Sequence, residues 1–89
     1  MTAMQQSKGY FYVEIPSEDI KIVFSLDNIR YVDMRPKDEQ MSIKGIYIEY
    51  IDGKEIYIAP YKPNKVAEKM LVVYHKQIME TLTKNNICD

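Results

Sequence analysis

The amino-acid sequence predicts an α+β fold, an antiparallel five-stranded β-meander with one long C-terminal helix packed on one face. Stretches rich in isoleucine, valine and tyrosine come first and are separated by turn-forming residues. Helical spacing of apolar residues occurs only near the end of the chain. With 89 residues, the chain is long enough for one domain of this kind but too short for two.

Three strands are predicted in the first third of the chain. Residues 10–15 (YFYVEI) are aromatic or β-branched and end at Pro16, which indicates a first strand. Residues 20–26 alternate with a period of two and form the second strand. Its predicted inner face consists of Ile20, Ile22, Phe24 and Leu26. Asp27 and Asn28 both tolerate positive φ, so they predict a tight hairpin into a third strand, residues 29–34.

Two further strands and the helix follow a charged loop. Residues 35–40 (RPKDEQ) form this loop, and strands are predicted for residues 43–51 and 54–59. The helix begins near Pro63, because proline lacks an N–H that would be unpaired in the first helical turn. Its apolar residues recur at spacings of three and four: Val66, Ala67, Met70, Leu71, Tyr74, Ile78 and Leu82.

The two ends of the chain are polar. Residues 1–9 are predicted to be a flexible leader, and Asn85 with Asn86 is predicted to stop the helix. The domain organisation that follows is a leader over residues 1–9, a single α+β domain over residues 10–84 and a tail over residues 85–89.

The stretch GIYIEYIDGKEIYIAPY, residues 45–61, raises the question of which side chains face the core. A two-residue loop at Asp52 and Gly53 would mix isoleucines and tyrosines on both faces of the hairpin. A three-residue loop, residues 51–53 with Gly53 in the left-handed conformation, gathers the isoleucines on one face that the helix can cover. We therefore predict the three-residue loop. The isoleucines on this face are Ile46, Ile48, Ile56 and Ile58.

The same register places tyrosines on the opposite face. Tyr47 and Tyr57 become a cross-strand pair, and Glu49 lies opposite Glu55 beyond them, which favours a solvated surface. Three interpretations remain open: ordinary strand surface, a protein interface, or a platform for stacking nucleobases. Neighbouring strands could add one more tyrosine to this face. The predicted binding residues are Tyr47, Tyr57, Tyr31 and Tyr12.

The sequence lacks the residue patterns that most enzymes and metal sites need. His75 is the single histidine, and Cys88 is the single cysteine and lies in the predicted tail. A chain with one of each cannot build a two-histidine or cysteine-rich metal site by itself. The three glycines are far apart, which excludes a glycine-rich phosphate loop. We therefore predict no catalytic residues, no metal and no cofactor.

These observations predict a small non-catalytic protein-interaction or regulatory module that self-associates through the tyrosine-bearing face. The alternative is single-stranded nucleic-acid binding, with tyrosines as stacking faces and lysines near the helix as phosphate contacts. These lysines are Lys62, Lys65, Lys69 and Lys76. The formal net charge of −1 argues against nucleic acid as the partner, so a homo-oligomer or a protein partner is predicted.

The sequence also bears on location. The first nine residues, MTAMQQSKG, lack the apolar segment of a signal peptide, and no apolar run approaches the roughly 20 residues of a membrane span. A cytoplasmic protein without membrane contact is the expectation.

Three segments in order carry a family resemblance: LDNIRYVD, then IYIEYIDGKEIYI, then the helix VAEKMLVVYHKQIMETL. This order resembles small bacterial and phage proteins in which two hairpins precede a closing helix, such as the FlbD-like proteins of flagellar operons. The resemblance spans about residues 24–79 and implies a bacterial or phage accessory protein with a meander-plus-helix fold. This chain has an additional N-terminal strand and a longer middle loop, and the resemblance assigns no functional residue.

Overall fold

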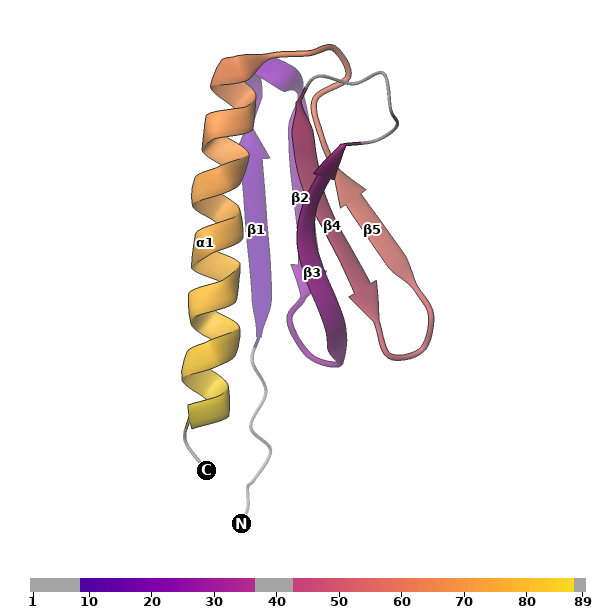
Figure 1. Cartoon of the computed structure of the whole chain (residues 1–89). Coiled ribbons are helices and arrows are strands. Elements are labelled where there is room, and N and C mark those ends of the chain that lie inside the picture. The colour runs from indigo at the N-terminus through magenta and orange to yellow at the C-terminus, as the bar shows by residue number, and fades with distance from the viewer. Residues whose placement is uncertain (1–8, 37–42, 88–89) are drawn as a thin grey trace.

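The computed structural model describes residues 9–36 and 43–87. Within these ranges the chain folds into five β-strands, a short 3-10 helix and one long α-helix (Figure 1). The elements are β1 (Tyr10–Ile15), η1 (Pro16–Glu18), β2 (Ile20–Ser25), β3 (Ile29–Pro36), β4 (Lys44–Tyr50), β5 (Glu55–Ile58) and α1 (Lys65–Ile87).

The predicted α+β class is confirmed, but the single five-stranded meander is not. Strands β1 and β2 form a two-stranded antiparallel sheet, and β3, β4 and β5 form a separate three-stranded antiparallel sheet. Among the described residues no hydrogen-bonded ladder joins β2 to β3. The expected tight hairpin between them is therefore absent from this part of the chain.

The contacts around Asn28 explain why the sheet divides there. Asn28 adopts the predicted positive φ of 66°, but its carbonyl accepts a hydrogen bond of 2.9 Å from the N–H of Ile51 in the β4–β5 turn. The carbonyl of Ser25 at the end of β2 accepts a hydrogen bond of 2.5 Å from the hydroxyl of Tyr50. The N–H of Leu26, which a two-residue β2–β3 hairpin would pair with Ile29, donates instead to the carbonyl of Gly9 at 2.8 Å. The end of β2 is thus bonded to the segment before β1 and to the β4–β5 hairpin, and not to β3.

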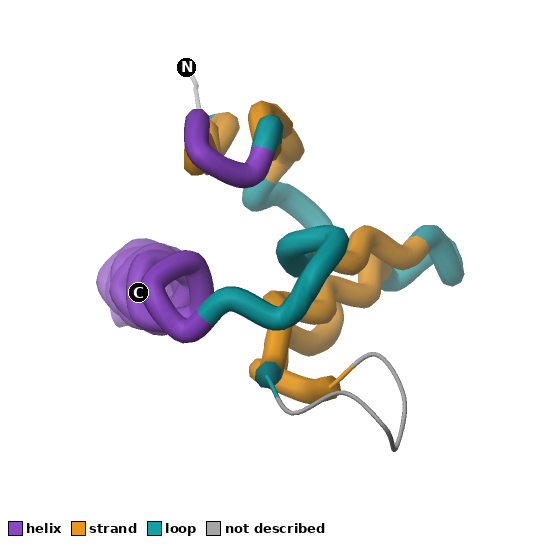
Figure 2. Tube along the Cα trace, turned by 90° about the horizontal axis from the view of Figure 1, so that it is seen from above, coloured by secondary structure: helices purple, strands orange, loops and turns teal. Residues whose placement is uncertain are grey.

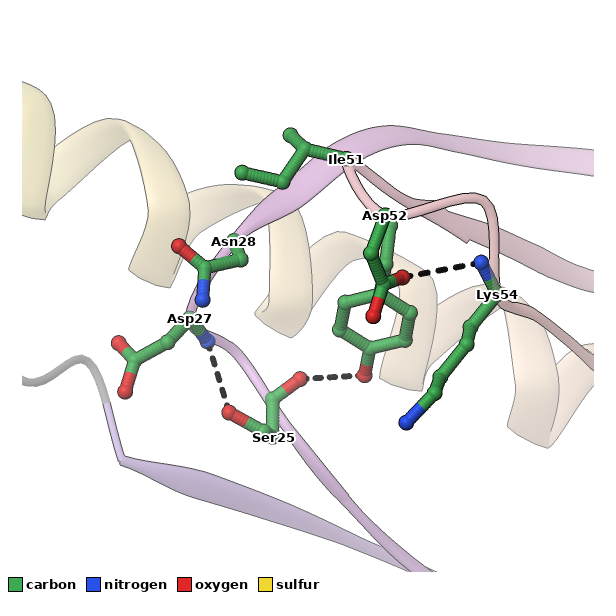
Figure 3. Close-up of a pocket in the computed structure, with 7 residues that line it drawn as sticks. Ser25, Asp27, Asn28, Ile51, Asp52 and Lys54 are labelled. Carbon is green, nitrogen blue, oxygen red and sulfur yellow. Dashed lines mark hydrogen bonds between the residues drawn. The ribbon is translucent and has the colours of Figure 1, made fainter.

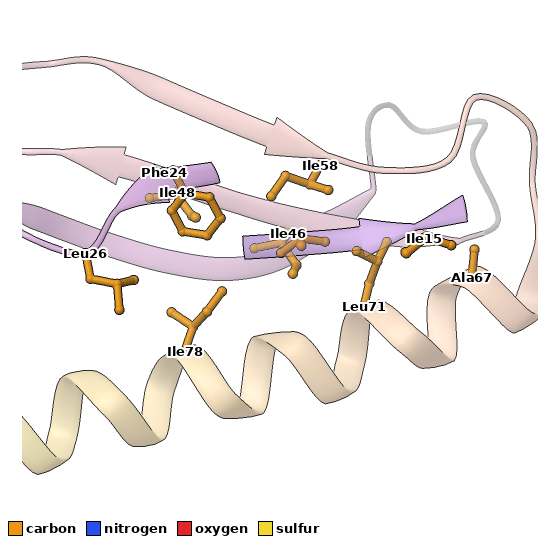
Figure 4. Close-up of a cluster of buried hydrophobic side chains, with 10 residues drawn as sticks. Ile15, Phe24, Leu26, Ile46, Ile48, Ile58, Ala67, Leu71 and Ile78 are labelled. Atoms are coloured by element: carbon orange, nitrogen blue, oxygen red, sulfur yellow. The ribbon is translucent and has the colours of Figure 1, made fainter. Parts of the chain in front are cut away.

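The two sheets and the helix surround one core. Viewed from above, α1, the β1–β2 hairpin and the β3–β4–β5 sheet lie on three sides of a common centre (Figure 2). Buried side chains from all three meet there, several of them labelled in Figure 4. They are Val13, Ile15, Phe24, Leu26, Ile46, Ile48, Ile58, Ala67, Leu71 and Ile78. The predicted apolar face of β4 and β5 is confirmed, with Ile56 half-buried against the same cluster.

The helix begins two residues later than predicted because Asn64 caps it. The Asn64 Oδ1 accepts hydrogen bonds from the N–H groups of Val66 at 2.9 Å and Ala67 at 3.2 Å, which satisfies two free donors of the first turn. Pro63 therefore precedes the cap. At its other end α1 continues through Asn85 and Asn86 to Ile87, so the predicted stop is wrong.

The apolar stripe of α1 is narrower than predicted. Ala67, Leu71 and Ile78 are buried, and Tyr74 and Leu82 pack partly against the core. Val66 and Met70 are 66% and 37% exposed, because they lie on the flank of the helix and not at the centre of its inner face. Among the described residues, no helix combines the length and the apolar character needed to cross a membrane.

Candidate functional site

The β4–β5 turn sets the orientation of the tyrosines, and the predicted three-residue loop is confirmed. The N–H of Tyr50 donates to the carbonyl of Lys54 at 2.8 Å, and the N–H of Gly53 donates to the carbonyl of Tyr50 at 2.9 Å. Gly53 has φ of 95°, in the left-handed region that favours glycine. Tyr47 consequently pairs with Tyr57, and Glu49 pairs with Glu55.

The face of the three-stranded sheet that points away from the core is called the outer face below. Strand pairing arranges its residues in three rows across β3, β4 and β5. The middle row is Asp33, Tyr47 and Tyr57. The rows on either side are Arg35 with Gly45, and Tyr31 with Glu49 and Glu55. Three of the four predicted binding tyrosines therefore share one surface.

A β-bulge at Arg30 allows Tyr31 to join the outer face. Ile29 pairs with Tyr50 and Tyr31 pairs with Glu49, so Arg30 is an additional residue with no partner of its own on β4. Strict alternation would place Ile29 and Tyr31 on the same face. The bulge reverses this parity, and Ile29 packs against the core while Tyr31 is 45% exposed on the outer face.

Arg35 belongs to the outer face, although it is not among the binding residues predicted from the sequence. Its guanidinium carbon lies 3.9 Å from the ring centroid of Tyr47 and 5.6 Å from that of Tyr31. The two rings are themselves 6.2 Å apart and inclined by 62°. Arg35 Nε also lies 3.7 Å from Asp33 Oδ2. The charged stretch RPKDEQ predicted a loop that begins at Arg35, whereas β3 extends to Pro36 and carries Arg35 over the rings.

Tyr57 packs across the central strand. Its hydroxyl donates a hydrogen bond of 2.8 Å to the carbonyl of Arg35 on β3. The ring passes over Gly45, where an added Cβ would lie 3.0 Å from Tyr57 Cζ and only 2.4 Å from the carbonyl oxygen of Ile58. Gly45 therefore makes room for Tyr57, which explains why this tyrosine is half-buried on an outward-facing surface.

Carboxylates hold the other two hydroxyls. Tyr31 donates to Asp33 Oδ2 and Tyr47 donates to Glu49 Oε1, both at 3.1 Å. The pKa of Tyr47 is raised to about 12. The largest cause is partial burial, and the hydrogen bonds to Glu49 and Glu55 and the negative charges of these two residues add to it. Tyr47 is thus a neutral donor throughout the physiological pH range.

Tyr12, the fourth predicted residue, does not belong to this surface. It lies on β1 in the other sheet, where it pairs with Val23 and is 44% exposed. The suggestion that it could adjoin Tyr47 and Tyr57 is wrong, because the sheet divides between β2 and β3.

The predicted helix lysines also lie away from the tyrosines. Lys65, Lys69 and Lys76 are exposed on α1, whose buried residues contact the core side of the sheet. The outer face is on the opposite side of that sheet. One bound ligand would have to pass around the domain to reach both groups.

A cavity separate from the outer face lies between the turn after β2 and the β4–β5 turn (Figure 3). This cavity of about 380 Å³ is lined by Ser25, Asp27, Asn28, Tyr50, Ile51, Asp52 and Lys54. Its polar groups mostly serve the turns themselves: Ser25 Oγ accepts from the N–H of Asp27, and Asp52 Oδ1 accepts from the N–H of Lys54, both at 3.0 Å. No cluster of three or more metal-binding side chains is found in the described residues.

Comparison with protein-family models, with curated proteins and with solved structures finds no match to this chain. The interpretation of the outer face therefore depends on its own chemistry.

Proposed function

We propose that this chain is a small non-catalytic protein-interaction or regulatory module that self-associates through the outer face. The observation that carries the proposal is the stacking of the Arg35 guanidinium 3.9 Å from the Tyr47 ring, beside Tyr31. Tyrosine and arginine are enriched at the centres of protein interfaces, where both supply flat contact area together with hydrogen-bond donors.

Hydrogen bonds hold the three tyrosine side chains of the outer face in place. Tyr57 is bonded to the Arg35 carbonyl, Tyr47 to Glu49, and Tyr31 to Asp33. Side chains that are already ordered lose less conformational entropy when a partner binds. This arrangement supports a contact surface more than it supports a set of unconnected surface tyrosines.

The size of the chain favours self-association. A domain of 89 residues has on the order of 5 kcal/mol of net stability. Burying the outer face of one copy against another would remove further aromatic surface from water. A dimer would therefore add to the stability of each copy.

Single-stranded nucleic-acid binding is the weaker candidate. The outer face carries the carboxylates of Asp33, Glu49 and Glu55, which repel phosphates. The helix lysines that could attract phosphates lie on the other side of the sheet. Arg30 and Arg35 offset two of these three carboxylates, so the outer face keeps a net negative charge.

Light scattering coupled to gel filtration tests the proposal. We expect the wild-type chain at micromolar concentration to have a mass above the 10.5 kDa of a monomer. Tyr31→Ser and Tyr47→Ser should shift the mass towards the monomer, whereas Tyr61→Ser, at a residue that is 91% exposed outside the sheet, should not. A wild-type chain that is monomeric at every concentration would refute self-association. A salt-dependent shift with single-stranded DNA, lost in Tyr31→Ser, would favour the other candidate.

A further inference from the structure

We infer that two copies meet about a two-fold axis that passes through Tyr47 and pairs Arg35 of each copy with Glu55 of the other. This inference rests on the proposed self-association and specifies its geometry. It follows from the distribution of charge over the outer face and from the strand register.

The charges on the outer face are unevenly matched within one copy. Arg30 lies 3.5 Å from Glu49, and Arg35 lies 3.7 Å from Asp33. Glu55 makes no ion pair within the described part of the chain, and the register places it opposite Glu49. Like charges directly opposite on neighbouring strands are destabilising. Glu55 is thus an exposed carboxylate that would gain from a cation supplied by another molecule.

Arg35 can supply that cation. It contacts Asp33 through Nε, and the side chain of Arg35 remains 42% exposed. A guanidinium presents several N–H donors in a fixed plane and can bind a second carboxylate while it stays stacked on a ring. The stacking on Tyr47 holds this plane in one orientation.

The positions of these two residues are symmetric about Tyr47. Arg35 on β3 is level with Gly45, and Glu55 on β5 is level with Glu49. Gly45 and Glu49 are each two residues from Tyr47 along β4, in opposite directions, and β3 and β5 flank β4 on either side. Tyr47 therefore lies at the midpoint of the diagonal from Arg35 to Glu55.

A two-fold axis through that midpoint forms two ion pairs at once. If the axis lies in the interface plane and perpendicular to the diagonal, each Arg35 meets the Glu55 of the other copy. Both copies then use the same patch, as cyclic dimers require. With strands about 4.8 Å apart and a rise of about 3.4 Å per residue, the strands of the two copies would cross at about 70°, which is close to orthogonal sheet packing.

Another axis through Tyr47 satisfies the charges less well. An axis along β4 would bring Glu49 over Glu49 of the other copy. It would also place Arg35 opposite Ala59, the residue after β5 that is level with Gly45, and no ion pair would form there. The diagonal axis does bring Asp33 near Glu49 of the other copy. Each of these carboxylates already contacts an arginine of its own copy, which reduces the repulsion.

Reversal of the two charges tests the pairing. We expect Arg35→Glu and Glu55→Arg each to be monomeric at concentrations where the wild-type chain is dimeric, because two repulsive contacts replace two attractive ones. An equimolar mixture of the two variants should restore a one-to-one heterodimer, detectable by native mass spectrometry. In that heterodimer one contact is reversed and the other is native. The double variant Arg35→Glu with Glu55→Arg should dimerise with itself.

Glu55→Arg is the variant on which the inference depends most, because Glu55 is exposed and lies outside the core, and its replacement leaves the stacking of Arg35 on Tyr47 in place. Arg35→Glu also removes the stacking on Tyr47, so circular dichroism must show that it folds. Lys69→Glu, an equal charge change on α1, is the matched control and should stay dimeric. Two results would show that the pairing is wrong: a Glu55→Arg variant that remains dimeric, or a mixture that gives no heterodimer. If Tyr31→Ser is nevertheless monomeric, the proposed function stands. A monomeric wild-type chain overturns both.

Discussion

The Tyr57 hydroxyl on β5 donates a hydrogen bond of 2.8 Å to the Arg35 carbonyl on β3, and its ring crosses the central strand above Gly45. Arg35 in turn stacks on Tyr47. The three strands are therefore joined on their outer face by side chains as well as by the backbone ladder. The absence of a side chain at Gly45 is a condition for this arrangement.

Replacement of Gly45 by alanine should destabilise the domain by about 1–3 kcal/mol, the usual cost of adding atoms where packing is tight. The new Cβ would lie 2.4 Å from the Ile58 carbonyl oxygen and 2.6 Å from Ala59 Cβ. Urea unfolding followed by circular dichroism measures the change. Lys44→Ala, at the exposed neighbouring residue, is the control and should stay within about 0.5 kcal/mol of the wild type. Equal midpoints for both variants would contradict the close packing.

Tyr50→Phe and Tyr74→Phe should each cost about 1 kcal/mol, because each removes one partly buried hydrogen bond. Tyr50 donates to the Ser25 carbonyl and joins the two sheets, and Tyr74 donates to the Glu14 carbonyl and joins α1 to β1. Unfolding in urea again gives the values. Tyr61→Phe, at a residue that is 91% exposed, should leave stability unchanged. A loss no larger than that of Tyr61→Phe would show that these contacts contribute nothing measurable.

Tyr47 should be among the last tyrosines to ionise, with a pKa of about 12. Unfolded tyrosine loses its proton near pH 10. As the pH rises from about 10 to about 12, the unfolded chain releases a proton that folded Tyr47 keeps, so this residue lowers folding stability with rising pH in that window. Tyrosinate absorbance at 295 nm, compared between wild type and Tyr47→Phe, should differ by a step near pH 12. A difference centred near pH 10 would mean that neither burial nor Glu49 and Glu55 raise the pKa of Tyr47.

Asn64→Ala should cost about 0.5–2 kcal/mol through loss of the helix cap. The Asn64 Oδ1 accepts from two N–H groups, and its amide nitrogen donates to Glu18 of η1, so the residue joins the helix to the β1–β2 connection. Asn64→Asp keeps the acceptor but places a second carboxylate beside Glu18. We expect this variant to be less stable than the wild type, because the two carboxylates repel each other and the hydrogen bond from the amide nitrogen to Glu18 is lost. If thermal unfolding shows that Asn64→Ala is as stable as the wild type, the capping role is contradicted.

Local patterns in the sequence were sufficient to predict the strands and the register between β4 and β5. Gly53 and the alternation of Ile46, Ile48, Ile56 and Ile58 depend only on neighbouring residues, and the structure agrees with both. The same alternation predicted that Tyr47 and Tyr57 face away from the core. Their role in binding remains a prediction.

Features that depend on distant residues were not predictable in the same way. The two sheets are joined by a hydrogen bond between Tyr50 and Ser25, which are 25 positions apart. The bulge at Arg30 changes the parity of β3 without a glycine to signal it. The stacking of Arg35 requires β3 to extend beyond its apolar residues, which the proline in RPKDEQ argued against. Each of these features depends on packing against other elements, so the propensities of neighbouring residues do not predict it.

The division between the two sheets also has a dynamic consequence. Amide protons on β4 are flanked by strands on both sides, whereas β1 and β2 protect only each other. The hairpin could detach by releasing side-chain contacts without breaking any ladder of the three-stranded sheet. In deuterium exchange, the amides of β1 and β2 would then be labelled through a partial opening, and those of β4 only when the whole molecule unfolds.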